Sequence, residues 1–568
     1  MLRSPWKAFA CVLGVAALCL PAAACGGSDA DDDDGSPARG TATGPVVPPI
    51  KMLGPSPAYD PGENESLKVV AEEMEKLGFT VELEGVPDFG TFDELAQQHE
   101  FDIGSTGYLG SLPRLEPTEL MGPALTCENV DASNYSGYCN DEFEQHFQDA
   151  LQSSDPEERH AASDAAQVQL AEDLPMVVMY YPTVSTVDNQ ETASDGTFNP
   201  STGFFNFWSF NQAVPSDGSL TFGIAEPGVS MNPMCNSAYF QVAEYQLLVF
   251  DPLTRVAADG SVENWAASEI ERVDDTTVLV TLRDGMEFHD GSPVTAEDVA
   301  FTFNYVKKWK VGRYLNQAAV IKSVKAEGDD QVRFELKEPY GPLEFALLSG
   351  IGIMPKKIWD GVTEREDIKT PCDWKNPSMV GSGPYTFVSY DPNSALRLER
   401  NPDHFSPPEA EELVGRFYAT QQSLFLDLRA GNVDYHDADP GFTPSQIKQA
   451  ESDEHLAIQR SPSTTVRFFA FNLREGSPFQ DYPLRKAVAQ LVDYDTIVGG
   501  ILQGQAVAGK GIIAPANELW HADAAVFPEY DPEAARRTLE EAGYGWDDQG
   551  RLHMPADREP QEFAEAGT

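Results

Sequence analysis

From Pro49 onwards, short runs rich in β-branched and aromatic residues alternate with longer runs that carry helical signals. The strand-like runs lie at 79–83, 176–181, 220–224, 278–282, 332–336 and 467–471. The helix-like runs lie at 65–77, 141–151, 156–170, 295–306, 424–430, 482–491 and 532–542. Mixed elements without an internal repeat or a regular strand–helix–strand rhythm predict an α/β protein built from more than one lobe.

Several of the predicted helices carry capping signals at their ends. Asp155 and Asp531 each stand before a proline, the order expected of an N-cap followed by the first helical position. Gly543 follows the last helix as a C-terminal signal. Thr295 and Asp298 have the spacing of a capping box. Side-chain chemistry therefore predicts where these helices begin and end.

The charge of the chain excludes some functions. Its 568 residues include 39 Lys and Arg against 91 Asp and Glu, which gives a formal charge of −52. Such a chain has no domain-scale basic surface with which to neutralise nucleic-acid phosphates. The same repulsion opposes adsorption of the folded body to an anionic membrane. The 41% of hydrophobic residues is enough for large cores, and the length predicts two or more globular units.

Residues 1–24 have the three parts of an export signal: a basic start, an apolar run at 8–20 and small residues before Cys25. The apolar run is shorter than a membrane-spanning helix. Small residues before a cysteine, with Gly and Ser after it, resemble a bacterial lipobox, in which the cysteine is diacylated and becomes the mature N-terminus. A plain signal peptide cut near Ala24 is the alternative. Residues 25–48, rich in Asp, Gly and Ser, are predicted to be a flexible acidic tether.

Four cysteines remain after the signal and the lipid are accounted for, and an even number in an exported protein favours disulfides. The pair Cys127–Cys139 closes the shorter loop, which leaves Cys235–Cys372 as the second bond. A zinc site is the alternative, but the spacing lacks a CxxC pair. We therefore expect two disulfides and no metal.

A specific pattern occupies the middle of the chain. Residues 263–268 read ENWAAS, and residues 282–299 read LRDGMEFHDGSPVTAEDV. Further matches are VGSGPY at 380–385, AGNVD at 430–434, LRKAV at 484–488, YDPEAA at 530–535 and EAGY at 541–544. In this order they resemble family 5 extracellular solute-binding proteins, the oligopeptide, dipeptide and nickel group that serves ABC importers. The resemblance covers most of residues 219–552.

The N-terminal part of the chain resembles the C-terminal part of the same family. Its matches are FDIGSTGY at 101–108, YCNDEF at 138–143, DPEER at 155–159 and LPMVVMYY at 174–181. The order of the segments thus resembles a circular permutation, with a new junction at 211–217. Two fused chains or a misassembled gene are the alternatives. Permutation is tolerated where the original termini are exposed and close together.

The resemblance implies a periplasmic-binding-protein-like type II fold (cluster C), with two lobes, a hinge and an extra subdomain in lobe I. We expect the following division: 1–24 signal peptide, 25–48 tether, 49–184 first part of lobe II, 185–465 lobe I with its subdomain, and 466–568 second part of lobe II. Such proteins close two lobes around a ligand.

The resemblance also implies where the ligand lies. The family contacts carry over to two segments, 231–239 and 107–111. The candidate ligand-binding residues are Tyr108, Leu109, Gly110, Ser111, Arg114, Ser237, Tyr239 and Tyr245. Peptide binders of the family have an Asp where this chain has Ser111, so a carboxylate partner for a ligand ammonium is missing there. Glu116 is a possible substitute if the loop shifts, and Arg114 a possible partner for a ligand carboxylate.

The sequence predicts a binding protein and not an enzyme. It contains no GxSxG, HExxH, SxxK or P-loop motif, and its nine His form no HxH or HxxH pair. We expect His289 to have a structural role, and we expect no cofactor. The predicted function is capture of a peptide or peptide-like solute for an ABC permease and ATPase, by a monomer lipid-anchored on the extracytoplasmic face of the cell membrane. A sensing receptor lipoprotein and a secreted hydrolase are the alternatives.

Acylation of Cys25 can be tested by detergent partitioning. Wild-type protein made in a bacterial host should enter the Triton X-114 phase, whereas Cys25→Ala should remain in the aqueous phase because it lacks the thiol that is acylated. Cys19→Ala, within the signal, is the matched control and should behave as wild type. A wild-type protein that stays in the aqueous phase would show that the chain is not acylated.

Overall fold

A computed structural model describes residues 44–110, 112–130, 132–224, 231–235, 240–311, 314–437 and 441–556. All of them belong to one compact unit, which spans 39–568. Within these described ranges no helix is long and apolar enough to cross a membrane. The predicted signal peptide and Cys25 lie outside the described residues.

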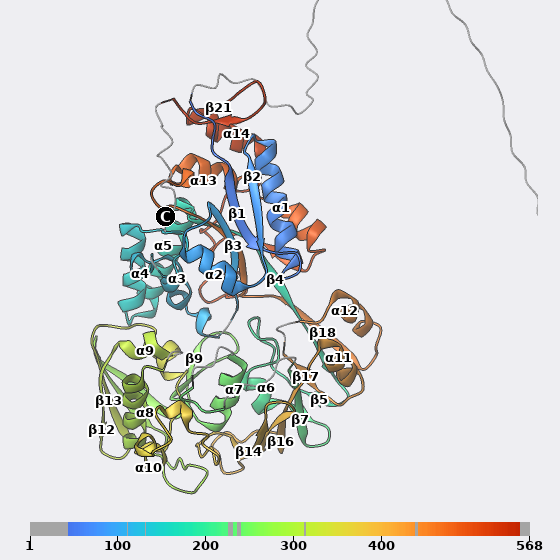
Figure 1. The fold of residues 1–568 in the computed structure, drawn as a ribbon. Coiled ribbons are helices and arrows are strands. Elements are labelled where there is room, and N and C mark those ends of the chain that lie inside the picture. The colour runs from blue at the N-terminus through green and yellow to red at the C-terminus, as the bar shows by residue number, and fades with distance from the viewer. Residues whose placement is uncertain are drawn as a thin grey trace, which may run out of the picture. The chain divides into compact units, whose positions relative to one another are not determined.

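One seven-stranded sheet joins the two ends of the chain. Its order is β18-β4-β19-β3-β1-β2, with β20 also on β4 (Figure 1). The strands are β1 (Ile50–Pro55), β2 (Val81–Val86), β3 (Ile103–Tyr108), β4 (Met176–Asn189), β18 (Leu456–Pro462), β19 (Val466–Phe471) and β20 (Ala506–Ala508). β1, β2 and β3 run parallel, whereas β19 is antiparallel to both β3 and β4. The carboxyl ends of β1, β2 and β3 therefore lie at one edge of the sheet.

Helices from both ends of the chain pack around this sheet. They are α1 (Pro61–Lys76), α2 (Phe89–Gln97), α3 (Pro117–Leu125), α4 (Asp141–Gln152), α5 (Pro156–Asp173), α13 (Tyr482–Ala489) and α14 (Pro532–Glu541). Their apolar faces and the sheet form one core, which includes Met52, Val70, Phe143, Phe469 and Leu539. We call this part of the molecule the first half.

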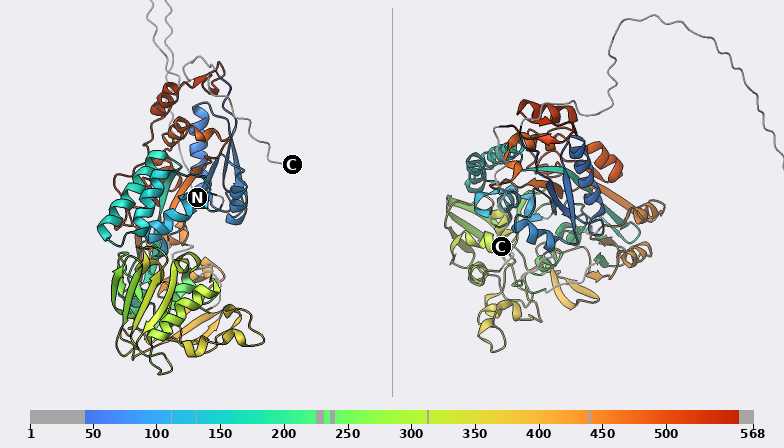
Figure 2. Two further views of the ribbon diagram at one scale, coloured as in Figure 1. Left: turned by 90° about the vertical axis from the view of Figure 1, so that its left-hand side faces the viewer. Right: turned by 45° about the horizontal axis from the view of Figure 1, so that its top comes forward.

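The middle of the chain builds the second half, which contains two further sheets. One is antiparallel with the order β10-β11-β13-β12, and the other is mixed with the order β14-β15-β16-β7-β17. The first comprises β10 (Ala267–Asp274), β11 (Thr277–Leu282), β12 (Ile321–Glu327) and β13 (Gln331–Leu336). The second comprises β7 (Ser219–Ile224), β14 (Tyr385–Asp391), β15 (Ala395–Arg400), β16 (Glu412–Phe417) and β17 (Tyr435–His436). Figure 2 shows the antiparallel sheet in green, below the teal helices α4 and α5.

Each sheet of the second half has its own core. The antiparallel sheet packs on α8, with Val280, Phe303 and Phe334 among the buried residues. The mixed sheet packs an aromatic cluster that includes Phe205 and Phe222. The helices here are α6 (Phe207–Gln212), α7 (Phe240–Val249), α8 (Ala296–Trp309), α9 (Leu315–Ala319), α10 (Lys356–Trp359), α11 (Gln421–Arg429) and α12 (Pro444–Ala450). Two-stranded pairs complete the fold: β5 (Ala193–Ser194) with β6 (Val214–Pro215), β8 (Thr254–Val256) with β9 (Val262–Asn264), and β21 (Gly545–Trp546) with β22 (Leu552–His553).

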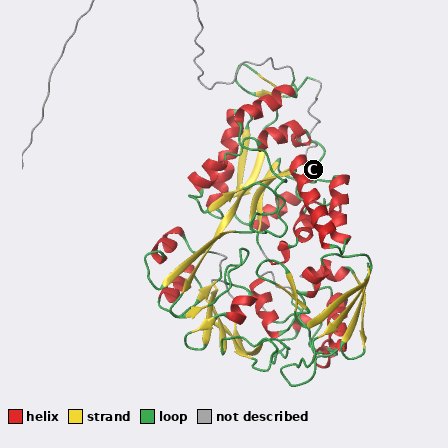
Figure 3. Ribbon diagram, turned by 180° about the vertical axis from the view of Figure 1, so that it is seen from behind, coloured by secondary structure: helices red, strands yellow, loops and turns green. Residues whose placement is uncertain are grey.

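The long strand β4 belongs to both halves. Its first part pairs with β19 and β20, and its second part, from Thr183 to Asn189, pairs with β18. Figure 3 shows this long strand running from one half towards the other. A small core around Val187, Leu424 and Phe442 packs where the pair enters the second half. We call the paired segment the β4–β18 ribbon.

The two ends of the described chain are paired with each other. Val47 donates its backbone N–H to Leu552 at 2.9 Å, and Val46 forms a β-bridge with His553. A permuted chain is opened where its parent is continuous, so its new ends are expected to stay neighbours, as these ends are; the permutation itself stays a prediction. The expected junction is folded: Asn211 lies in the last turn of α6, and its side chain donates to Ser406 O at 3.1 Å.

The predicted elements are present. All six strand-like runs overlap strands, and all seven helix-like runs overlap helices. Asp155 and Asp531 accept hydrogen bonds as N-caps, and Thr295 with Asp298 forms the capping box. The largest difference is β4, which continues to Asn189 instead of ending near Tyr181. It continues because β18, remote in sequence, supplies a partner for its second part.

Both predicted disulfides are confirmed: Cys127 is bonded to Cys139, and Cys235 to Cys372. The two bonds differ in the length of chain that they close, with sequence separations of 12 and 137. Loop-closure entropy in the unfolded chain grows with that length, so the second bond constrains the unfolded chain more.

Removing each disulfide should therefore lower the free energy of unfolding by different amounts. We expect about 3 kcal/mol for Cys127→Ala with Cys139→Ala, and about 5 kcal/mol for Cys235→Ala with Cys372→Ala. Urea unfolding followed by circular dichroism measures both under the same conditions. Equal losses, or a larger loss for the Cys127 pair, would contradict this reading.

Candidate ligand-binding site

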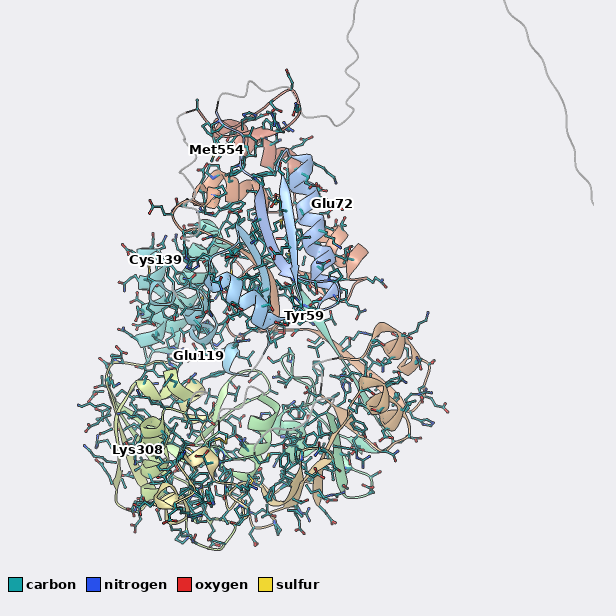
Figure 4. The ribbon with its side chains drawn as sticks, viewed as in Figure 1. Tyr59, Glu72, Glu119, Cys139, Lys308 and Met554 are labelled. Atoms are coloured by element: carbon teal, nitrogen blue, oxygen red, sulfur yellow. A yellow bond between two sulfur atoms is a disulfide. The ribbon has the colours of Figure 1, made fainter. Side chains whose placement is uncertain are left out.

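Ligands of open α/β sheets usually bind at the carboxyl ends of the parallel strands, and here the connection after β3 forms one side of the candidate site. The connections that leave these ends expose large apolar side chains. Tyr59, Phe89 and Leu109 follow β1, β2 and β3 and are 50%, 49% and 46% exposed. Figure 4 shows Tyr59 at the end of the first half that faces the second half. Of the three, Leu109 lines the cavity described next.

A cavity of about 470 Å³ lies where the connection after β3 meets the β4–β18 ribbon. Its volume is within the range of small-molecule sites. Residues from both halves line it: Leu109, Gly110, Pro182, Thr183, Val184, Ser185, Ser201, Thr202, Asp437, Gly441, Phe442, Ile447, Lys448, Glu451, Arg460, Ser463, Thr465, Arg467 and Gln505. The cavity thus lies beside the segment that connects the two halves.

Tyr108, at the end of β3, is half-buried beside the cavity. Its ring centroid is 4.9 Å from that of Phe468, and the Arg114 guanidinium carbon lies 5.5 Å from the Tyr108 ring centroid. Burial raises the pKa of the Tyr108 hydroxyl, which stays neutral at physiological pH. Arg114 Nη1 also donates to Leu109 O at 2.8 Å. Arg114 therefore braces the Tyr108–Leu109 turn.

The connection after β3 is tied to the segment between β18 and β19. Gly110 N donates to Thr465 Oγ1 at 2.7 Å. A Cβ on Gly110 would lie 2.5 Å from Thr464 Oγ1, so only glycine allows this approach. Across the same segment, the hydroxyls of Ser201 and Thr464 are 2.8 Å apart. These contacts hold Leu109 and Gly110 at the edge of the cavity.

Arg467 of β19 lines the cavity and lies over β3. Its Nη2 is 3.6 Å from Asp60 Oδ2, and its Nε is 3.5 Å from Glu63 Oε2. A Cβ on Gly107 would lie 2.2 Å from Arg467 Nη1, so glycine at that position makes room for the guanidinium. The side chain is thus positioned by two carboxylates at the start of α1.

Glu63 is buried under this group, with 3% of its surface exposed. Burial raises its pKa from 4.5 to about 7, although Arg467 and the hydroxyl of Ser105 both act to lower it. Ser105 Oγ donates to Glu63 Oε1 at 2.8 Å. Near neutral pH the charge of Glu63, and hence its hold on Arg467, is therefore only partial.

The predicted ligand-binding residues fall into three groups. Leu109 and Gly110 line the cavity, and Tyr108 and Arg114 support them without lining it. Ser111, Ser237 and Tyr239 lie outside the described residues. Tyr245 lies in the core of the second half, 2% exposed, with its ring centroid 5.3 Å from that of Phe205. A side chain in that position packs the core and does not face a solute.

Two other expectations concern Glu116 and His289. Glu116 as a substitute for the missing Asp was wrong: it is 1% exposed, caps α3 and pairs with Arg159 at 2.7 Å. His289 has the structural position expected of it, with Nε2 3.0 Å from Gly383 O and Nδ1 3.3 Å from Gly381 N.

Sequence reasoning missed the residues of the ribbon, of β19 and of the turn before α6. Ser185, Thr202 and Arg467 line the cavity, yet none belongs to a motif that pointed to a ligand. The one available signal was Arg467, a charged residue inside a strand-like run that is otherwise apolar and aromatic. An internal charge in a buried strand needs a partner or a function.

A second contact between the halves lies at α3. Glu119 accepts hydrogen bonds from Gln317 Nε2 at 2.8 Å and from Tyr340 Oη at 3.0 Å, both in the second half. Figure 4 shows Glu119 at the edge of the first half that faces the second. Burial raises the pKa of the Glu119 carboxyl. The two halves therefore meet at the β4–β18 ribbon and again at Glu119.

A sequence profile of bacterial extracellular solute-binding proteins, family 5 (middle region), matches residues 261–566, more than half of the chain. The chain belongs to this family. The same set of residues, 44–556 with its gaps, holds no group of three or more His, Cys, Asp or Glu that could bind a metal ion.

Individual curated proteins also resemble the chain. A Brucella ovis protein named as an ABC transporter peptide-binding protein is 26% identical over 329 residues, 56% of this chain and 58% of the relative. The oligopeptide-binding protein AppA of Bacillus subtilis is 26% identical over 52% of this chain and 54% of its own. A solved structure of AppA with a nonapeptide has 23% identity and a TM-score of 0.43, over 61% of this chain and 67% of that one. The chain thus spans little more than half the length of these curated relatives.

The buried carboxyl of Glu63 predicts a pH dependence of stability. Because its pKa is raised in the folded state, folding keeps a proton that the unfolded chain releases as pH rises above about 4.5. The free energy of unfolding of wild type, measured against Glu63→Gln, should fall between pH 4.5 and 7, by up to ~3 kcal/mol.

Chemical denaturation across that pH range measures the difference. Glu65→Gln, an exposed position on the same helix, is the matched control and should follow wild type. A stability difference between wild type and Glu63→Gln that does not change with pH would show that the Glu63 carboxyl is not perturbed.

Proposed function

We propose that this family 5 protein captures a peptide or peptide-like solute between its two halves and delivers it to an ABC importer. The cavity beside the β4–β18 ribbon carries the proposal, because the connection after β3 and the ribbon line it together. A hinge of two strands allows the halves to close on a solute. The names of the Brucella and Bacillus relatives, which refer to peptide binding, agree with this function.

In this proposal Cys25 carries the lipid, and residues 25–48 let the binding protein reach a permease at the extracytoplasmic face. The chain acts as a monomer and uses no cofactor. Leu109, Gly110 and the ribbon contact the solute, and Tyr108 and Arg114 support them. Ser111, Ser237 and Tyr239 stay candidates at the positions that the family resemblance assigns to the cleft.

Mass spectrometry of material released from purified, denatured protein identifies the natural solute. A released peptide whose uptake is lost on deletion of the gene supports capture for import. A released peptide whose uptake survives the deletion favours the sensing alternative. A released non-peptide solute contradicts peptide capture.

Tyr108→Ala should weaken binding of the identified solute by about 1–3 kcal/mol, as expected for loss of an aromatic support at a binding site. The loss follows because the Tyr108 ring packs against Phe468 and Tyr108 directly precedes Leu109, which lines the cavity. Isothermal titration calorimetry measures the change in Kd.

Tyr245→Phe is the matched control. The Tyr245 hydroxyl is buried and has no hydrogen-bond partner within the described part of the chain, so its removal should leave the affinity unchanged. Unchanged affinity of Tyr108→Ala for the solute would show that the solute does not bind at the end of β3.

A further inference from the structure

The two halves are joined through main-chain atoms as well as through Glu119. Gly341 N, in the segment after β13, donates to Leu151 O near the end of α4 at 2.6 Å. The Leu151 side chain packs against the cores of both halves. Together with the hydrogen bonds that Glu119 accepts from Gln317 and Tyr340, these interactions form one interface, which we call the Gly341 contact.

The fit around Gly341 is tight, and the tightness comes from the first half. A Cβ on Gly341 would lie 2.2 Å from Ser153 O and 2.7 Å from Arg159 Nε, so only glycine allows this approach. The φ of Gly341 lies outside the left-handed region, and alanine can therefore adopt the same backbone. The need for glycine thus arises from the contact between the halves and not from the local turn.

Each side of the Gly341 contact is held in place by its own half. In the second half, Arg272 of β10 donates to Tyr340 O at 3.2 Å and to Gly341 O at 3.0 Å. In the first half, Arg159 pairs with Glu116 at 2.7 Å. Surfaces that are already ordered lose little conformational entropy when they meet, so more of the contact free energy remains to join the halves.

The Gly341 contact is separate from the cavity and from the β4–β18 ribbon. None of its five residues lines the cavity. In Figure 1 the ribbon lies on one side of the molecule, and α9, which carries Gln317, lies on the other. The halves are therefore linked on two sides, by continuous chain at the ribbon and by non-covalent contacts at Gly341. A hinge motion at the ribbon that parts the halves breaks the Gly341 contact.

We propose that the Gly341 contact holds the two halves together when no solute is bound. Every donor and acceptor in the contact belongs to the chain itself, so its free energy favours the joined halves with or without a solute. The free-energy cost of joining the halves is then not charged to solute binding, and the contact has to open for the solute to enter and leave. This inference goes beyond the proposed function, because it does not depend on which solute is captured.

The test uses purified protein that has been freed of solute by unfolding in urea with its disulfides intact, followed by refolding. Small-angle X-ray scattering gives the radius of gyration. Hydrogen–deuterium exchange, resolved to residue 341 with overlapping peptides, reports on the contact directly, because the acceptor of the Gly341 amide belongs to the other half. In wild type this amide should be protected from exchange.

Gly341→Ala should increase the radius of gyration and speed exchange at residue 341 by about 10-fold or more, because its Cβ collides with Ser153 O. Gly350→Ala is the matched control: it lies in the same half, its φ is also outside the left-handed region, and a Cβ there meets no atom closer than 3.5 Å. It should behave as wild type. Glu119→Ala removes two hydrogen bonds without changing Gly341, and should also speed exchange at residue 341.

Circular dichroism shows whether each variant folds, and Glu119→Ala decides the matter if Gly341→Ala does not. An unprotected Gly341 amide in solute-free wild type overturns the inference. Wild-type exchange in the folded Gly341→Ala or Glu119→Ala variant, or an equal expansion in Gly350→Ala, also overturns it. No measurement here contains a solute, so peptide capture is decided separately, by mass spectrometry of the released solute.

Discussion

The continuity of β4 is the constraint on which the rest of the structure depends. A strand has two edges, and β4 uses them differently along its length: β19 and β20 pair with its first part, and β18 pairs with its second. One hydrogen-bonded ladder therefore belongs to both halves. The position of the cavity follows from it, because Pro182 to Ser185, which line the cavity, lie where β4 changes partners. Two paired strands are also the smallest connection between the halves in which the backbone N–H and C=O groups of each strand find hydrogen-bond partners in the other.

Close backbone approach explains why glycines recur at the junctions. Gly381 and Gly383 belong to the VGSGPY turn, and a Cβ on them would lie 1.9 Å from Val249 O and 2.3 Å from Leu248 O. The turn therefore packs directly against the end of α7. Gly107 differs from them, since the space it leaves is filled by the guanidinium of Arg467. Glycine thus allows two backbone segments to pack directly at Gly381 and Gly383, and leaves room for a side chain at Gly107.

The sequence predicted local structure better than it predicted the site. Capping residues such as Asp155 and Thr295 act within one turn of helix, so their effect can be read from neighbouring residues. The two disulfides were predicted because so few pairings were possible. Tyr245 shows the limit: its aromatic ring suits a binding site equally well, and only the packing of Phe205 and Phe210 around it places it in a core. Arg467 was missed for the opposite reason: its side chain lines the cavity because of Gly107 and Glu63, which lie hundreds of positions away in the sequence.

The pKa of the Glu119 carboxyl depends on the contact that this residue makes with the second half. Its carboxyl accepts from Tyr340 and Gln317 of the second half, and burial in this arrangement raises its pKa. Loss of this contact would let water reach the carboxyl and return its pKa towards the ordinary value. The contact therefore holds a fraction of a proton more than a separated Glu119 would. Mildly acidic surroundings thus stabilise the Glu119 contact, and alkaline surroundings weaken it, at a residue that lies apart from the cavity lining.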